Sequence, residues 1–232
     1  MRKKLSLQPR LALLASLVPR GAVPADVGTD HGYIPVYLRQ EGVIDHAIAS
    51  DIGREPLEHA RRTAEEYEAD GIDFRLCAGL EAIAPNECDT VLIAGMGGET
   101  IMGILAAAPW TRDGAHTLLL QPQTKIEELR LWLCEHGYAI VRERLVRDKG
   151  KLYIVMTVTA GVCFTPNAEQ LYSGLSLDGD ALYGEYLTAQ TARLRRRADG
   201  LRLSGRGETD GFAALADALE EKRRKWEHDN ST

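Results

Sequence analysis

Short apolar runs recur along the chain up to about residue 160, with helix-like stretches between them. Five runs predict strands, at residues 22–27, 46–50, 73–76, 90–94 and 117–120. Amphipathic segments such as 56–69 and 124–136 lie between them. Strands that alternate with helices are typical of βαβ units and of a mainly parallel sheet. Leucines at helical spacing, at Leu7, Leu11, Leu14 and Leu17, also predict an amphipathic first helix.

The pattern changes after residue 136. Two strand-like runs, 138–147 and 152–159, flank the short connection from Asp148 to Lys151. Such a short connection favours a β-hairpin. We therefore expect an α/β fold in which a mainly parallel sheet closes with an antiparallel hairpin.

The composition shifts again beyond residue 160. Residues 165–167 (Thr-Pro-Asn) mark a boundary, and two helical segments follow at 179–203 and 209–228, joined by a Ser-Gly-Arg-Gly turn. Two helices bury too little apolar surface to fold alone, so a helical hairpin docked on the sheet domain, or projecting from it, is predicted. The expected domains are residues 1–163 and 164–232.

The overall composition is that of a folded globular protein with a local concentration of positive charge. Of the 232 residues, 44% are hydrophobic and 27% are charged, and the net charge is −6. Six arginines of the tail are accompanied only by Asp199; they are Arg193, Arg195, Arg196, Arg197, Arg202 and Arg206. This segregation indicates an anionic partner, although a solvated helix face is the alternative.

The cysteines, the histidines and the N-terminus exclude other classes of protein. The four cysteines form no C-x-x-C pair, and the six histidines show no ligand spacing. We therefore expect reduced, mostly buried thiols in a cytoplasmic protein, without a metal ion. The apolar run at 11–18 is too short to span a membrane, and we expect the first helix there rather than a signal peptide. A monomer is the expected assembly.

The segment from Ala25 to Tyr33 carries the clearest chemical signal. It follows a predicted strand and opens a helix, where exposed backbone N–H groups collect. Its spacing is D-x-G-x-x-x-G rather than the dinucleotide pattern G-x-G-x-x-G. Because Asp30 would repel a pyrophosphate, a cationic or neutral ligand is favoured over NAD. Asp51, at the end of the next strand, stands where a carboxylate accepts ribose hydroxyls, with a helix N-cap as the alternative role. Asp26 and Asp30 favour a sulfonium cofactor, S-adenosylmethionine.

Two further loops are expected at the same edge of the sheet. Gly95, Met96, Gly97 and Gly98 follow the fourth parallel strand, and the amides of Gln121 and Gln123 follow the fifth. Because the carboxyl ends of parallel strands meet at one edge, these loops should converge on one crevice.

Several motifs together resemble the bacterial tRNA (adenine-22-N1)-methyltransferases, a class I S-adenosylmethionine-dependent group. They are DVGTDHGYIP, SDIGREPLEHAR, DTVLIAGMGGETI, LLLQPQ and the KLYIV strand, and the resemblance covers residues 5–160. It implies a Rossmann-like methyltransferase sheet, S-adenosylmethionine as cofactor and tRNA as partner.

The resemblance also implies roles for individual residues. The cofactor-binding residues expected are Asp26, Gly28, Asp51, Ile52, Ala78, Gly79, Leu80 and Gly95. The expected catalytic residue is Asp30, near the target base. The expected substrate-binding residues are His31, Tyr33, Met96, Gly97, Gly98, Gln121, Gln123, Arg193, Arg195, Arg196 and Arg197.

One position departs from the family. Ala78 stands where the family commonly has a polar residue that meets the cofactor's adenine. Backbone N–H groups or a neighbour must then hold adenine there. Two other functions stay open: a methyltransferase for a small molecule or protein, and a non-catalytic RNA-binding protein on the same fold.

Overall fold

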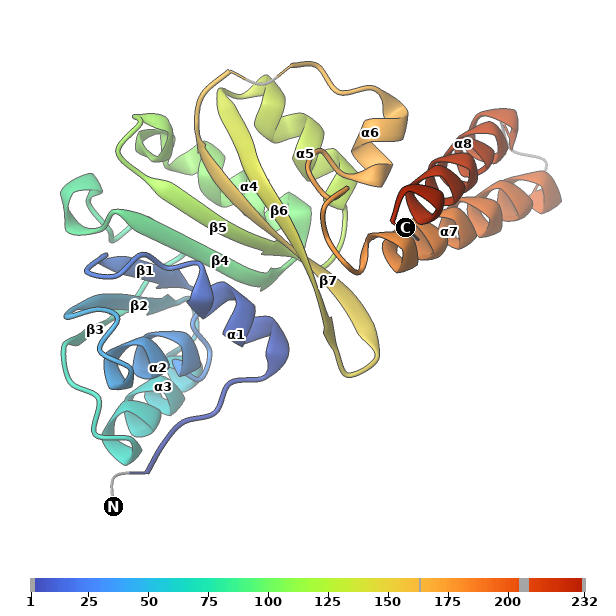
Figure 1. Cartoon of the computed structure of the whole chain (residues 1–232). Coiled ribbons are helices and arrows are strands. Elements are labelled where there is room, and N and C mark those ends of the chain that lie inside the picture. Colours follow the sequence, from blue (N-terminus) through green and yellow to red (C-terminus); the bar gives the residue numbers. More distant parts are fainter. Residues whose placement is uncertain (1–2, 163, 205–208, 231–232) are drawn as a thin grey trace.

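The computed structural model describes residues 3–162, 164–204 and 209–230, and its centre is one mixed sheet (Figure 1). The seven strands run in the order β3-β2-β1-β4-β5-β7-β6. The strands are β1 (Pro24–Val27), β2 (Ala47–Asp51), β3 (Ile72–Leu76), β4 (Thr90–Met96), β5 (Thr117–Pro122), β6 (Tyr138–Asp148) and β7 (Lys151–Ala160). The α-helices are α1 (Pro9–Ser16), α2 (Tyr33–Gln40), α3 (Arg54–Glu66), α4 (Gly98–Ala107), α5 (Ile126–Glu135), α6 (Ala168–Ser173), α7 (Tyr183–Ser204) and α8 (Thr209–Asp229). Short 3-10 helices lie at Pro85–Glu87 and Pro109–Arg112.

The predicted sheet is confirmed. Strands β1 to β5 pair in parallel, whereas β7 pairs antiparallel with both β5 and β6. The β6–β7 turn has positive φ at Lys149 (47°) and Gly150 (75°). Two consecutive left-handed residues are typical of the two-residue turns whose twist matches a hairpin.

Alternate residues of the central strands face opposite layers of helices. Leu92, Leu119 and Val155 pack against α1 and α2, in a cluster that includes Leu14 and Leu38. Their neighbours along the strands, including Val91, Leu118 and Met156, pack with α4 and α5 on the other face. Because both faces are covered, these strands are apolar throughout, which is the pattern that the sequence carries.

The strand order creates the crevice expected for a ligand. From β1 the chain passes to β2 on one side, and it later returns to β4 on the other side of β1. In open α/β sheets the loops diverge at this switch point, so that a ligand binds outside the carboxyl ends of the two strands.

The C-terminal helices are joined to the sheet through a buried ion pair. Arg130 of α5 donates to Glu143 of β6 at 2.7 Å, and neither side chain is exposed to solvent. The second oxygen of Glu143 accepts backbone N–H groups at Leu175 and Ser176, and Arg130 also contacts the Tyr186 hydroxyl of α7. Removing one partner of a buried pair leaves an uncompensated charge, so this network fixes where α7 begins.

The helical hairpin is therefore docked at one end and projects at the other (Figure 1). Tyr183, Tyr186, Leu187 and Leu194 of α7 are buried, whereas Leu203 is exposed. The division into domains at residues 163 and 164 stays a prediction, because the apolar core runs without a break from α5 into α7 and α8.

The structure corrects some local predictions. The first helix of the tail begins at Tyr183 rather than 179, because the Asp180 carboxylate accepts the N–H groups of Leu182 and Leu145 and holds a turn against β6. The short helix α6 lies where only a boundary was predicted. Helix α1 begins at Pro9, so Leu7 precedes it.

Two further predictions concern the thiols and the membrane. Cys77 and Cys88 are free thiols, as expected. Cys134 is disulfide-bonded, which contradicts the expected reduced thiol; linear spacing does not show which sulfurs approach each other in the fold. Cys163 and the turn at 205–207 lie outside the described residues. Within the described part of the chain, no helix combines the length and the apolar character that crossing a membrane requires.

Candidate active site

A left-handed turn follows β1 and forms the floor of the site. Gly28, Asp30 and Gly32 have φ of 71°, 51° and 67°. Among residues with side chains, aspartate tolerates this region best, so Asp30 fits it. The N–H groups of Gly28 and Thr29 donate to the Ser50 carbonyl at 2.8 and 2.9 Å, which ties the turn to β2. A Cβ added at Gly28 would lie 2.3 Å from the Met96 Cε atom, so the close approach requires glycine.

Asp51 connects this turn to the next one. Its Oδ2 atom accepts the Asp30 N–H at 3.3 Å, and its Oδ1 atom accepts the Gly53 N–H at 2.8 Å. The alternative role as N-cap of the following helix is wrong, because the N-cap residue of α3 is Gly53. Asp51 still lines the cavity, so its carboxylate faces the ligand space while it orders both loops.

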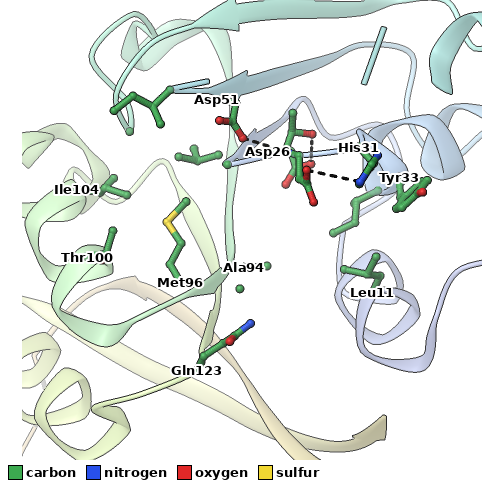
Figure 2. Close-up of a pocket in the computed structure, with 18 of the residues that line it drawn as sticks. Leu11, Asp26, His31, Tyr33, Asp51, Ala94, Met96, Thr100, Ile104 and Gln123 are labelled. Atoms are coloured by element: carbon green, nitrogen blue, oxygen red, sulfur yellow. Dashed lines mark hydrogen bonds and ion pairs between the residues drawn. The ribbon is translucent and has the colours of Figure 1, made fainter. Parts of the chain in front are cut away.

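A cavity of about 560 Å³ opens at the carboxyl ends of β1, β2 and β4. Figure 2 shows His31 and Tyr33 on one side of it, and Met96, Thr100 and Ile104 on the other. Twelve of the predicted site residues line it: Asp26, Gly28, Asp30, His31, Tyr33, Asp51, Ile52, Ala78, Gly79, Gly95, Met96 and Gln123.

Four predicted residues do not line this cavity. Leu80 is buried behind Ala78 and Gly79. Gly97 is the N-cap residue of α4, and a Cβ on Gly98 would meet the Lys125 carbonyl at 2.6 Å, so Gly98 serves packing. Gln121 is fully buried, and its Oε1 atom accepts from the Gly95 N–H at 3.1 Å and from Arg10 at 2.7 Å. It supports the Gly-rich loop from below instead of contacting a ligand.

The sequence analysis missed the contribution of α1. Arg10 and Leu11 line the cavity, and Arg10 is the one lysine or arginine among its lining residues in the described chain. The Arg10 guanidinium also lies 5.5 Å above the ring of Tyr153. The leucine pattern predicted the helix but gave no sign that its first turn reaches the site. Thr100 and Ile104 of α4 and Cys77 were missed for the same reason.

Three aromatic rings stack at the mouth of the cavity. His31 lies 5.2 Å from Tyr33 and 5.2 Å from His59 of α3, with interplanar angles of 15° and 5°. The His31 Nε2 atom is 3.7 Å from an Asp30 carboxylate oxygen. Tyr33 is 38% exposed, so one flat face of this stack remains available to solvent or ligand.

The chain was compared with known proteins. A family model described as a methyltransferase domain matches residues 7–156. The tRNA (adenine(22)-N(1))-methyltransferase of Bacillus subtilis (strain 168) is 36% identical over 188 residues, which cover 81% of this chain and 77% of that protein.

Solved structures agree over most of the chain. The crystal structure of the B. subtilis m1A22 tRNA methyltransferase matches with a TM-score of 0.78 and 29% identity, covering 97% of this chain and 99% of that one. A Streptococcus pneumoniae protein in complex with S-adenosyl-L-methionine matches with a TM-score of 0.80 and 29% identity, covering 90% and 97% of the two chains.

The chain belongs to the tRNA (adenine(22)-N(1))-methyltransferase family. The fold class and the resemblance predicted from the sequence are thereby confirmed. Among residues 3–162, 164–204 and 209–230, no group of three or more His, Cys, Asp or Glu side chains is arranged to hold a metal ion.

The tail arginines of this family member are not all available to a partner. Arg193 donates to Glu127 of α5 at 2.6 Å and lies 5.3 Å from the centre of the Tyr172 ring, so it helps to dock the tail. Arg195 contacts Asp217 at 3.5 Å, and Arg197 lies over Phe212. Arg195, Arg196 and Arg197 are exposed, whereas Arg206 lies outside the described residues. The predicted arrangement, with Asp199 as the only neighbouring acid, is wrong because acids distant in sequence fold onto the helix.

Asp26 is a strained electrostatic feature of the methyltransferase site. It is only 6% exposed, and burial raises its pKa to about 6, with a further rise from the charge of Asp51. A hydrogen bond from the Thr29 hydroxyl, at 2.6 Å, opposes the rise. A buried carboxylate near the switch point is well suited to a cationic ligand.

We predict that Asp26→Asn stabilises the free protein at neutral pH. Because the folded pKa is raised, wild type loses stability as the pH rises from about 4 to about 6, by up to roughly 3 kcal/mol. Asparagine avoids this loss and still accepts the Thr29 hydroxyl. Urea unfolding should show the variant to be more stable at pH 7.5 and equal to wild type below pH 4. Exposed Asp45→Asn is the control, and no gain for Asp26→Asn at pH 7.5 would refute this electrostatic account.

Proposed function

We propose that this protein transfers a methyl group from S-adenosylmethionine to N1 of adenosine 22 in tRNA. The observation that carries the proposal is the cavity at the switch point, in which Asp26, Asp30 and Asp51 stand on one side of the crevice and Arg10 closes another. Family membership gives this arrangement its reaction class.

The nucleoside part of the cofactor fits one end of the cavity. Asp51 provides a carboxylate for the ribose hydroxyls, which explains why it ends β2. Ile52 is 78% exposed and lines the cavity, and Ile104 lines it from α4. An exposed isoleucine beside a polar site is costly without a ligand, and a planar adenine would cover it. These apolar side chains answer the absence of a polar side chain at Ala78, where Gly79 has φ of 56°.

The charged groups match the other part of the cofactor. The sulfonium is cationic, so the buried Asp26 carboxylate attracts it, and Arg10 matches the methionine carboxylate. When bound, the cofactor supplies a methyl group on a positively charged sulfur. We also retain, as parts of the proposal, a monomeric enzyme and a cytoplasmic location.

The protein's chemical task is positioning. Adenine N1 already carries a lone pair, so it requires no deprotonation, and it must approach in line at about 3 to 3.5 Å. Asp30 is exposed at the mouth of the cavity and is held there by its left-handed backbone. Its carboxylate accepts from the exocyclic amino group and stabilises the positive charge that develops on the ring.

The proposal is tested by incubating the protein with isotope-labelled S-adenosylmethionine and unmodified tRNA, followed by mass spectrometry of the nucleosides. We expect labelled 1-methyladenosine, and none from a tRNA with guanosine at position 22. Cofactor binding without transfer to any tRNA would instead favour a small-molecule or protein substrate. A failure to bind the cofactor would favour a non-catalytic RNA-binding protein.

We predict that Asp30→Ala separates catalysis from cofactor binding. Turnover should fall by about 10²-fold, the scale of a lost preorganised contact in the transition state, while cofactor affinity stays within a few fold. Asp30→Asn should retain more activity, since asparagine tolerates positive φ and keeps an oxygen acceptor. Steady-state kinetics and calorimetry measure both quantities. A parallel loss of affinity and turnover would make Asp30 a cofactor ligand.

A second prediction concerns the tail as a tRNA contact. Replacing Arg195, Arg196 and Arg197 together by alanine should weaken tRNA binding and make the logarithmic salt dependence shallower by about two to three units, because each lost phosphate contact releases fewer counterions. Arg193 is left intact because it docks the tail.

The matched control removes three paired cations from α8, Arg223, Arg224 and Lys225, each of which lies beside a glutamate of its own helix. The control should change the slope less, and the cofactor affinity of both variants should equal that of wild type. An unchanged slope for the α7 variant would exclude this patch as an RNA contact.

A further inference from the structure

A second cavity, of about 430 Å³, adjoins the cofactor cavity. The two share Arg10, Leu11, Asp30 and Tyr33. The other walls of the second cavity come from the N-terminal segment, with Leu5, Ser6, Leu7 and Gln8, and from Tyr67 at the end of α3. These five residues do not line the cofactor cavity.

The N-terminal segment is held firmly enough to form a wall. Gln40 of α2 accepts the Leu5 N–H at 3.0 Å and donates to the carbonyls of Lys3 and Tyr67, both at 2.9 Å. Leu5 is 6% exposed and packs with Val36 and Ala64. A single amide therefore joins the segment, α2 and the end of α3.

We propose that this second cavity holds the target adenine, an inference that rests on the proposed function. The acceptor nitrogen must come within about 3 to 3.5 Å of the methyl group, so its site must open into the cofactor cavity. The shared residues place that opening beside Asp30 and Arg10, away from the end that suits the nucleoside of the cofactor.

The chemistry of the second cavity suits an extruded base. Tyr33 and Tyr67 offer aromatic faces, and Leu5 and Leu7 offer apolar contact for a ring that has left its stack. Ser6, Gln8 and Asp30 provide donors and acceptors for the base edge. By contrast, a smaller cavity of about 250 Å³ meets the opposite end of the cofactor site at Ala78 and Ile104 and has no aromatic lining.

Filling the second cavity tests the assignment. Ser6→Phe places an aromatic ring in it without removing a contact of the cofactor site. Ser16→Phe, an identical change on an exposed position of α1 outside both cavities, is the matched control. We expect Ser6→Phe to lower the single-turnover rate of tRNA methylation at least tenfold at saturating enzyme. Its affinities for S-adenosylmethionine and tRNA should stay within about twofold, because phosphate contacts dominate tRNA affinity.

A second variant guards against a misfolded Ser6→Phe protein. Gln8 makes no side-chain capping hydrogen bond, so Gln8→Ala should leave α1 intact and lower the same rate several fold. A wild-type rate in both variants, or a loss of cofactor affinity equal to the loss of rate, would overturn the assignment. A wild-type protein that methylates no tRNA would instead overturn the proposed function, and this assignment with it.

Discussion

The left-handed turn after β1 is the constraint on which both cavities depend. Three of its five residues, Gly28, Asp30 and Gly32, have positive φ, and its N–H groups are bound to the end of β2. So tight a reversal keeps the backbone clear of the crevice while it presents Asp30 at the boundary between the two cavities. The same turn brings the missing side chain of Gly28 against Met96, so the loop after β4 closes over it. Cofactor binding and acceptor binding therefore share one piece of backbone.

Buried charge is used in two opposite ways in this protein. Arg130 and Glu143 are both fully buried, but each is paired and surrounded by further hydrogen bonds, so the network specifies how the tail docks. Asp26 has only the Thr29 hydroxyl as a recorded partner among the described residues, and its raised pKa reflects the free energy cost of that isolation. A cationic ligand would reduce this cost on binding. Such local destabilisation is typical of sites built to bind charge.

Much of the fold and of the site was predictable because the signals are local. Alternating burial on the central strands and the glycines of the turn after β1 belong to short stretches of sequence, and both the sheet and most of the cavity were found from them. The errors concern contacts between distant residues. Arg10 and Gln121 bond across a separation of 111 residues, and Arg193 and Glu127 across 66. No periodicity encodes such pairs, so Gln121 was taken for a ligand contact, Arg10 was missed, and Arg193 was counted with the free cations.

The central claim is that the glycine turn after β1 forms the cofactor site, and one binding comparison tests it most directly. Gly28 and Gly21 both have positive φ, of 71° and 78°, so alanine carries a similar backbone cost at either position. Only at Gly28 does the added Cβ meet the site, since nothing lies within 4 Å of a Cβ at Gly21. Calorimetric titration of the folded variants with S-adenosylmethionine should show at least a tenfold loss of affinity for Gly28→Ala and wild-type affinity for Gly21→Ala. Equal affinities in the two variants would contradict the account.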